Sequence, residues 1–495
     1  MRHLFFPPRF QPSDVTCSGM RRRSRLVGCR RGLSETNLTR LALGIGLVAP
    51  IFEIPRHERL IARVPTSTSD VAHLLRRAGF GGSKSDIAAL SGLDLAALVE
   101  HVLDDSSAPV DSPPIEFSNP NVSGWDKYVG LVHWWYDRMA TSSTPLVEKM
   151  TLFWHGHFTS SHATVNNTVW MYDQNALFRR RAMGNVRLLA QEMAIQPAML
   201  TYLDNRWNTK RGAQQNFARE LMELFTMGIG NYSEADVVDV ARAWTGHTVN
   251  GTTGLYEFRA SNHDTGAKTI FGTTKNWDGP QVIDEIFTNA ITSDVVARFL
   301  VTKLWTFFAY PNPTPTLVTS LATAFESANF DVKSLLRAMF LRPEFFSSSA
   351  KQALVRTPTE FVVAVLRGTG LVAADLHPEW FSDGMGQELF DPPNVAGWKN
   401  NSYWLTTNAL SARADLAENA HWKLSNLKRH PLEMKTALTP AALVDLASDL
   451  VDVDFSVGTR AVLTDFVVRT RAGVNGWTEP QLLVLALLAP EFHVS

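Results

Sequence analysis

One pattern dominates the chain from residue 70 onward: apolar residues recur every three or four positions in one short stretch after another. This spacing places apolar side chains on one face of an α-helix. Helix-capping residues such as Ser67 and Ser233 precede stretches of this kind, and glycines such as Gly79 and Gly228 follow them. We therefore predict an all-α fold, mostly an orthogonal multi-helix bundle.

Residues 246–280 interrupt this pattern. They are rich in Thr, Gly, Asn and aromatic residues and contain two short runs in which apolar and polar residues alternate. Such alternation is typical of strands. We expect a small β-hairpin and loop insertion at this point in the bundle.

The expected helices and loops divide the chain into three parts. The helices cover residues 70–78, 85–90, 93–102, 127–140, 145–158, 175–191, 197–204, 213–227, 234–244, 283–287, 293–308, 316–327, 332–340, 358–368 and 405–424, followed by two or three more. Proline-containing loops separate some of them at 104–124 and 390–404. We predict a basic leader over 1–50, a helical domain over 68–425, and a C-terminal helical extension over 426–495 that packs on it.

Charge is distributed unevenly along the chain. Residues 1–50 contain nine arginines and two acidic residues, a net charge of +7, whereas the remaining residues carry a net charge of −8. The total is close to zero, so the charge gives no reason to expect a nucleic acid as partner. A hydrophobic fraction of 45% and 14 tryptophans indicate a chain that forms a core.

The leader has features of an export signal. Arg30 and Arg31 resemble a twin-arginine motif, and the apolar run over 41–51 is too short to span a bilayer but suits the core of a signal peptide. No other stretch approaches the ~18 apolar residues of a transmembrane helix, so no transmembrane segment is expected. We expect export from the cytoplasm. A cytoplasmic protein with a disordered basic arm is the alternative.

The positions of the cysteines exclude several chemistries. The two cysteines, Cys17 and Cys29, both lie in the leader. The body therefore has no thiol nucleophile, no thiolate metal ligand and no disulfide. It also lacks the glycine-rich nucleotide loops, the His-Glu-x-x-His motif and the Gly-x-Ser-x-Gly motif, which gives no support for nucleotide-binding, zincin or α/β-hydrolase chemistry.

Histidines gather in one segment. His155, His157 and His162 lie within eight residues, and Glu148 precedes His155 by two helical turns. Imidazole and carboxylate groups bind divalent metals, so Glu148, His155 and His157 are candidate metal ligands. Side chains two residues apart point in nearly opposite directions on a helix, so both histidines could bind one ion only if the helix ends near Gly156. A polar pocket and simple packing are the alternatives.

A polar stripe marks the helix expected over 213–227. Asn216, Arg219, Glu220 and Glu223 share one side of the helix and apolar residues fill the other. Carboxylates that line a cleft could serve as acid and base, because neighbouring charges separate their pKa values. A solvent-facing stripe with an Arg219–Glu223 ion pair is the simpler interpretation.

Three loops hold further candidates. Asp204 begins a polar segment that could form Asx turns or bind a hard cation. His263, Asp264 and Lys268 bring an imidazole, a carboxylate and an ammonium group into one loop. Asn394 and Trp398 lie in the rigid segment DPPNVAGW, which would hold both at a fixed place.

Taken together, these segments resemble a bacterial family of unknown function, DUF1800, over about residues 70–420. The matching stretches are HLLRRAGFG (73–81), EKMTLFWHGHFTSS (148–161), NVRLLAQEMAIQPAMLTYLDN (185–205), NFARELMELFTMGIGNYSEADVVDVARAWTGHT (216–248), HDTGAKTIFG (263–272), ARFLVTKLWTFF (297–308) and FDPPNVAGWKN (390–400).

The resemblance implies a mostly helical protein, often with a twin-arginine leader. Genes of this family often lie beside genes of an uncharacterised exported family similar to sulfatases or phosphatases, which implies an exported protein partner. The family's polar positions fall on Glu148, His155, His157, Asp204, Asn216, Arg219, Glu220, Glu223, His263, Asp264, Lys268, Asn394 and Trp398. One departure is the loop 210–216, KRGAQQN, which lacks the usual proline and acidic residue and weakens the case for a cation site there.

Two functions are consistent with this sequence. The first is a helical binding or assembly protein in which these polar groups form a pocket or an ordering network. The alternative is a metal-assisted or acid–base hydrolase of ester-type substrates. In the alternative, Glu220 or Glu223 would be the general base and Arg219 the anion clamp, while His155 and His157 would bind a divalent metal or transfer protons beside His263 and Asp264.

Overall fold

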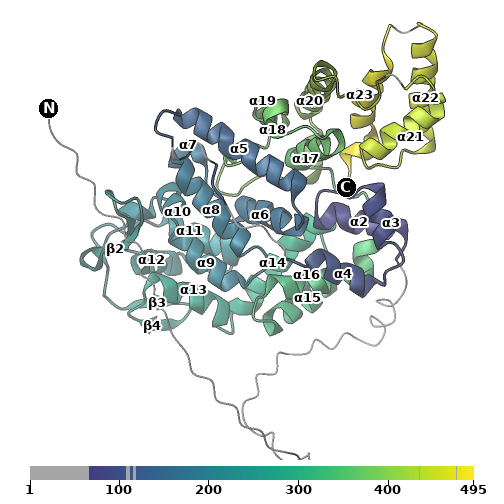
Figure 1. Cartoon of the computed structure of the whole chain (residues 1–495). Coiled ribbons are helices and arrows are strands. Elements are labelled where there is room, and N and C mark those ends of the chain that lie inside the picture. The colour runs from purple at the N-terminus through teal and green to yellow at the C-terminus, as the bar shows by residue number, and fades with distance from the viewer. Residues whose placement is uncertain (1–65, 107–111, 115–116, 118, 434, 475) are drawn as a thin grey trace, which may run out of the picture. The chain divides into compact units, whose positions relative to one another are not determined.

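The computed structural model describes residues 66–106, 112–114, 117, 119–433, 435–474 and 476–495. The chain divides into two units, residues 1–51 and 52–495, and all described residues belong to the second. The predicted leader, with Arg30, Arg31 and both cysteines, lies outside the described residues. Helices dominate the second unit (Figure 1), and two small sheets make up its strands. The prediction of an all-α fold with a small β insertion is confirmed.

The first half of this unit is a series of helices, several of which begin at a capping side chain. They are α2 (Thr68–Ala78), α3 (Lys84–Leu90), α4 (Leu95–Leu103), α5 (Gly124–Thr141), α6 (Pro145–His157), α7 (His162–Val165), α8 (Thr168–Arg180), α9 (Val186–Ala194), α10 (Pro197–Tyr202), the short η2 (Asn205–Trp207), α11 (Asn216–Glu220), η3 (Leu221–Thr226) and α12 (Glu234–Ala243). Ser67 and Ser233 each form a capping box with the aspartate three residues on, as their spacing predicts.

The second half continues in the same way after the insertion. Its helices are α13 (Gly279–Thr288), α14 (Thr292–Phe308), α15 (Pro315–Ser327), α16 (Val332–Phe340), η5 (Pro343–Phe346), α17 (Pro358–Thr369), α18 (Ala373–Leu376), α19 (Glu379–Met385), η6 (Asn401–Leu405), α20 (Thr407–Asn426), α21 (Pro440–Leu450), α22 (Val457–Arg471), η7 (Glu479–Gln481), α23 (Leu482–Leu487) and η8 (Pro490–His493).

The insertion contains two antiparallel hairpins, separated by the short helix η4 (Ala260–Asn262). Strands β1 (His247–Val249) and β2 (Tyr256–Phe258) pair with His247 opposite Phe258. Strands β3 (Lys268–Ile270) and β4 (Thr273–Lys275) pair with Lys268 opposite Lys275. No hydrogen-bonded ladder joins the two hairpins within the described residues, so the insertion is not one continuous sheet.

Two predicted helices differ from the structure. The helix expected over 175–191 is broken: α8 ends at Arg180, a turn follows, and the Asn185 side chain caps α9. The helix expected over 213–227 changes at Leu221 from the α form to the wider π form of η3. The first deviation is a turn and the second a change of helix type, and an apolar pattern encodes neither, since the pattern continues across them.

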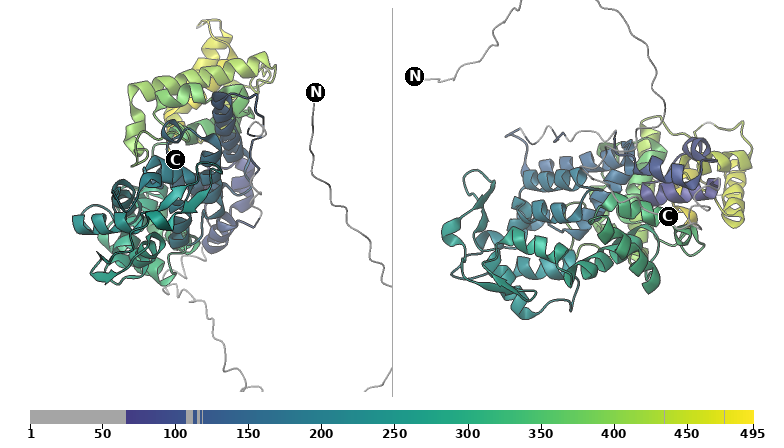
Figure 2. Two further views of the ribbon diagram at one scale, coloured as in Figure 1. Left: turned by 90° about the vertical axis from the view of Figure 1, so that its left-hand side faces the viewer. Right: turned by 90° about the horizontal axis from the view of Figure 1, so that it is seen from below.

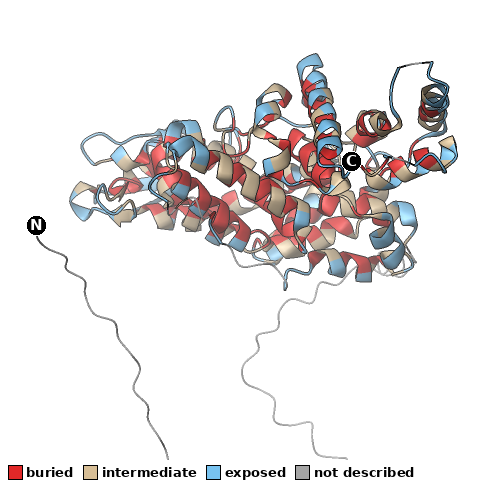
Figure 3. Cartoon of the chain, turned by 45° about the horizontal axis from the view of Figure 1, so that its top comes forward, coloured by how far each residue is buried: buried red, intermediate tan, exposed pale blue. Residues whose placement is uncertain are grey.

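Apolar side chains form two cores, and α6 contributes to both. Met150 and Trp154 belong to the first core, which α2, α4 and α9–α16 line. Leu152 belongs to the second, which α5, α17 and α20–α23 line. Every residue of α6 except Pro145 and Gly156 is buried, and Figure 3 shows how buried residues fill the inner sides of the helices. The polar side chains of α6 are therefore held inside the protein.

The two ends of the described chain meet. Arg77 of α2 donates to the Ser495 hydroxyl (3.3 Å), and Lys84 of α3 forms an ion pair with Asp449 of α21. The views of Figures 1 and 2 agree in placing these N-terminal and C-terminal helices side by side. The predicted boundary at residue 425 stays a prediction.

Candidate functional site

The loop 390–400 packs against the end of α6. The Phe390 amide donates to His155 Nε2 (3.1 Å), and the His162 amide donates to the Phe390 carbonyl (2.7 Å). Gly397 adopts φ +75°, and a Cβ there would lie 2.1 Å from the Gly156 carbonyl oxygen. This close approach of two backbones requires glycine. The Trp398 ring lies 5.3 Å from the His155 ring, and it covers the end of the helix.

Glu148 forms a buried charge cluster that joins three helices. Its carboxylate accepts from Arg138 of α5 (2.6 Å) and from Arg179 of α8 (2.7 and 2.9 Å), with a further bond from Trp135 Nε1 (3.1 Å). Burial opposes ionisation, but the two guanidinium groups hold the pKa of Glu148 below its usual value. Its oxygens are therefore engaged by cations and an indole, and the group fastens α5, α6 and α8 together.

His155 and His157 contact different parts of the protein. His155 faces Phe390 and Trp135, and burial lowers its pKa to about 3. His157 Nε2 donates to the Phe225 carbonyl (2.9 Å), while its Nδ1 accepts from Lys303 Nζ (3.2 Å). The helix continues through His157, so the two rings diverge as residues two apart on a helix do. None of these contacts brings the two histidines and Glu148 to a common point, and the metal prediction for them stays a prediction.

Lys303 of α14 is a partly buried cation that the sequence pattern did not single out. Its Nζ donates to the Leu224 carbonyl (3.0 Å) and to His157, and it lies 4.7 Å from the centre of the Phe299 ring. In the described part of the chain Lys303 has no ion pair with a carboxylate. Burial lowers its pKa to about 8. A lysine in such surroundings is a frequent mark of a functional site.

A signal for Lys303 does exist in the sequence. Leu300, Lys303, Leu304 and Phe307 follow the i, i+3, i+4, i+7 spacing of one helix face. A charged residue on such a face is either covered or paired. The apolar neighbours therefore indicate burial, although they do not reveal which other segments surround the lysine.

A cavity of about 200 Å³ lies beside His157 and Lys303. Residues from α6, α14 and the segment 387–400 line it. Three aromatic side chains, Phe153, Phe307 and Trp398, supply much of its apolar wall. Two of the predicted residues, His157 and Trp398, thus meet at one cavity, and Gln387 and Lys303 join them there.

Three side chains at this cavity offer hydrogen-bond donors. Trp398 Nε1–H is buried with no hydrogen-bond partner among the described residues. Gln387 uses its carbonyl oxygen to accept from the Thr359 amide (3.0 Å), which leaves its NH₂ group for another acceptor. Lys303 adds an ammonium group with a third N–H beyond its two bonds. The cavity is therefore suited to an acceptor, and a negative charge suits it best.

The polar stripe of α11 and η3 makes its own contacts. Arg219 forms a bidentate ion pair with Glu234 of α12 (2.8 Å to each oxygen), and Glu223 accepts from the Tyr232 hydroxyl. The predicted Arg219–Glu223 pair does not form, because the helix widens at Leu221 and Glu234 offers a better-placed carboxylate. Burial, with a smaller contribution from Glu223, raises the pKa of Glu220.

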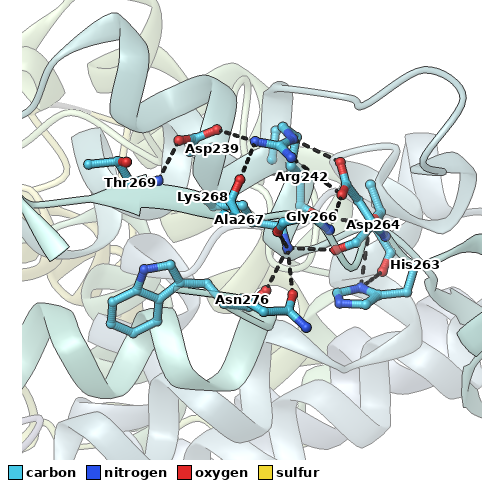
Figure 4. Close-up of polar contacts among 12 residues, drawn as sticks. Asp239, Arg242, His263, Asp264, Gly266, Ala267, Lys268, Thr269 and Asn276 are labelled. Carbon is cyan, nitrogen blue, oxygen red and sulfur yellow. Dashed lines mark hydrogen bonds and ion pairs between the residues drawn. The ribbon is translucent and has the colours of Figure 1, made fainter. Parts of the chain in front are cut away.

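The residues of the 263–268 loop form a network that fastens the insertion to α12 (Figure 4). His263 Nδ1 donates to the Thr245 carbonyl (2.8 Å), and Asp264 pairs with Arg242 (2.8 Å). The Lys268 ammonium donates to the carbonyls of Asp264 (2.5 Å), Gly266 (3.0 Å) and Trp277 (2.9 Å), and to Asn276 Oδ1 (3.2 Å). His263, Asp264 and Lys268 therefore all form hydrogen bonds or ion pairs within the protein.

The remaining candidates lie at the surface. Asp204 is exposed with φ 58°, Asn216 is exposed at the start of α11, and Asn394 is exposed with its side-chain oxygen accepting from the Ala396 amide (2.9 Å). Among the residues that the structure describes, no hydrogen bond or ion pair links the 216–223 stripe to His263 or Asp264, or either group to His155. The shared catalytic cleft of the hydrolase hypothesis has no support in these contacts.

The fold and the cavity define an all-α protein with a partly buried lysine at a cavity that offers hydrogen-bond donors. The family model described as "Protein of unknown function (DUF1800)" matches residues 73–494. Because this match covers most of the chain, the protein belongs to that family. Searches of curated proteins and of solved structures found no match. In the described residues, no helix is both long and apolar enough to span a membrane.

Proposed function

We propose that this protein binds a small, partly apolar anion in the cavity between α6, α14 and the segment 387–400. The negative group of the ligand would contact the Lys303 ammonium, and its apolar part would lie against Phe153, Phe307 and Trp398. The observation that carries this proposal is the partly buried charge of Lys303, which has no carboxylate partner among the described residues, at the wall of the cavity.

The charge of Lys303 needs an explanation, because even a partly buried ammonium without a carboxylate partner destabilises a protein. One role is structural: the lysine donates to the Leu224 carbonyl at the end of η3, where helices leave carbonyls unpaired. A solvent-exposed lysine would fill that role without the penalty of burial. An anion in the cavity would supply the missing counter-charge.

His157 supports an anionic ligand over a cationic one. Its Nε2 faces a carbonyl and must carry the proton, so its Nδ1 lone pair faces the Lys303 ammonium. Burial and the lysine keep the pKa of His157 well below its usual value. The imidazole is therefore neutral, and it orients the ammonium without neutralising it.

Benzoate is a suitable probe because it joins a carboxylate to an aromatic ring. We expect benzoate to bind the wild-type protein in isothermal titration calorimetry and benzyl alcohol, which lacks the charge, to bind at least about tenfold more weakly. The Lys303→Met variant should lose benzoate binding. Lys399→Met is the matched control, because Lys399 is an exposed lysine of the same segment that does not line the cavity. Equal benzoate affinity in Lys303→Met and wild type would refute the proposal.

We also propose that the protein is exported and works with an exported protein partner similar to sulfatases or phosphatases. The twin-arginine-like pair Arg30–Arg31 and the apolar run over 41–51 support export. Cell fractionation of the wild type and of an Arg30→Lys/Arg31→Lys double variant tests it. We expect only the wild type outside the cytoplasm, and an equal distribution of both would favour the cytoplasmic alternative.

A further inference from the structure

Two histidines and a glutamate converge at a second place in the protein. His133 lies on α5, His377 follows α18, and Glu379 begins α19. Glu379 contacts His133 through one carboxylate oxygen (Oε2 to Nε2, 2.6 Å) and His377 through the other (Oε1 to Nδ1, 3.0 Å). One atom from each of the three side chains lies within 4.8 Å of the others, and among the described residues they alone form such a group.

These side chains are held in place by their surroundings. The side chains of His133 and Glu379 are 13% and 7% exposed, and that of His377 is 35% exposed. The backbone of His377 is left-handed (φ 52°), a conformation that non-glycine residues adopt at a cost and that often marks functional positions. The Trp380 ring stacks on the His377 ring, with centres 4.2 Å apart and planes 5° from parallel. The imidazole is thus fixed in orientation as well as position.

From this arrangement we propose that His133, His377 and Glu379 bind a divalent transition-metal ion of the Zn²⁺ type. Imidazole nitrogens and a carboxylate oxygen are the donors that such ions prefer, and two histidines with one carboxylate are a recurrent three-residue ligand set. Donor atoms around a tetrahedral Zn²⁺ ion lie about 3.3 Å apart, given bonds of about 2.0 Å. The contacts of 2.6 and 3.0 Å use different oxygens of Glu379, and one donor atom from each of the three side chains lies within 4.8 Å of the other two, so side-chain rotations would bring the three donors to this spacing.

The exposure of His377 determines how the ion would be coordinated. Three protein ligands leave a fourth position, and the partly exposed side of the group is where solvent or a ligand would occupy it. This site is separate from the Lys303 cavity and does not depend on the proposed anion binding. Both draw on the same stretch of chain, since residues 377–400 supply two of the metal ligands at one end and Trp398 at the other.

Zn²⁺ titration of the full chain by isothermal titration calorimetry tests this proposal. Cys17 and Cys29 are themselves potential zinc ligands, so the titration uses a Cys17→Ser/Cys29→Ser background. We expect one ion per chain, and a loss of affinity of at least about tenfold in Glu379→Gln and in His377→Asn. Asparagine tolerates the left-handed backbone at position 377, and glutamine keeps the size of the side chain. Circular dichroism melting without metal verifies that both variants fold.

A second histidine pair provides the matched control. His421 Nδ1 and His430 Nε2 lie 3.1 Å apart, but no carboxylate completes a group of three there among the described residues. His421→Ala should therefore retain Zn²⁺ affinity, and Co²⁺ bound to the background protein should show visible absorption bands that Glu379→Gln abolishes. The proposal is overturned if the background protein binds no Zn²⁺, if Glu379→Gln binds as tightly as its parent, or if His421→Ala alone removes binding.

Discussion

At the scale of single residues, the Lys303 ammonium is a charge that the fold disfavours. Its pKa of about 8 lies below the ordinary value of 10.5, which means that folding disfavours the charged form. At pH 7, below this pKa, Lys303 nevertheless stays protonated in the folded protein, so its charge lowers the free energy of unfolding by the full amount. A residue that weakens its own protein in this way is expected where function requires the charge.

This cost predicts the behaviour of Lys303→Met. The variant should be more stable than the wild type by about 1–2 kcal/mol at pH 7, because removal of the partly buried charge outweighs the loss of two hydrogen bonds. Between pH 8 and 10.5 the unfolded wild type binds the proton and the folded wild type does not, so wild-type stability rises with pH. The advantage of the variant should therefore shrink over that range. Urea unfolding from pH 7 to 10 measures both effects, and a variant less stable at pH 7 would contradict the argument.

The same titration bears on the proposed ligand. Benzoate stays ionised throughout this range, so only the protein's charge changes. Its affinity should decline as the pH rises past about 8 and Lys303 loses its proton. A constant affinity up to pH 10 would indicate that the carboxylate does not contact this lysine.

The candidate site shows how far residue types and spacing can lead. The sequence identifies Trp398 and His157 as polar residues in otherwise apolar or rigid segments, and the structure places both at the cavity. It does not identify Gln387 or Lys303, because their significance comes from segments that meet only in the folded chain. Glu148 is the opposite case. Its position as an isolated acid in an apolar helix suggests a metal ligand, but in the structure it forms ion pairs with two arginines from other helices.

At the scale of elements, α6 and the loop 390–400 form the framework of the cavity. The contact between Gly156 and Gly397 sets how closely they approach. The sequence predicts α6 almost to the residue and describes the loop as rigid, since the proline pair restricts the backbone. It cannot predict that this loop closes on this helix, because their contact spans more than two hundred residues of chain.

Gly397→Ala should disturb the cavity more than it disturbs the fold. The new Cβ would overlap the Gly156 carbonyl and force the loop, with Trp398, away from α6. We expect a loss of stability of about 1–3 kcal/mol and a fall in benzoate affinity of at least about tenfold. Thermal melting and calorimetry measure the two effects.

Gly473→Ala separates backbone strain from the clash. Gly473 has a similar backbone angle (φ +68°), but nothing lies within 4 Å of its added Cβ. Gly473→Ala should lower the free energy of unfolding by about 1 kcal/mol and leave the benzoate affinity unchanged. If Gly397→Ala behaved in the same way, the packing of the loop on α6 would not determine the shape of the cavity.

The short strands depend on α12 in a way that their own sequence does not reveal. The side chain of Asp236 accepts from the Phe271 amide (3.0 Å), and that of Asp239 accepts from the Thr269 amide (2.7 Å). These carboxylates pair with an amide of β3 and with the amide that directly follows it, which would otherwise be available to another strand. The alternating pattern predicts strands here. The helix that stabilises them could be inferred only from the structure.

At the scale of the whole molecule, the C-terminal helices share the second core with central helices. Leu443, Leu482 and Phe492 are buried in the same cluster as Trp135 of α5 and Phe361 of α17. The last residues also pair with the segment before α17: the Arg356 amide donates to the His493 carbonyl (2.8 Å), and the Ser495 amide donates to the Leu354 carbonyl (2.9 Å). The family match likewise continues to residue 494.

These contacts predict that a chain ending at residue 425 will not fold cooperatively. Exposing one large apolar side chain to water removes about 1.5–3 kcal/mol of stabilisation. The free energy of unfolding of a whole domain is only about 5–15 kcal/mol. Arg413 would also lose its bond to His493 Nδ1 (2.9 Å) inside the protein. Circular dichroism melting and limited proteolysis of residues 1–425 measure the outcome.

The control is the full chain cut at a protease site inserted between α20 and α21, whose two pieces should remain associated because every core contact is kept. A sharp, near-wild-type transition in the 1–425 chain would instead establish 68–425 as a domain that folds alone, with 426–495 as an extension.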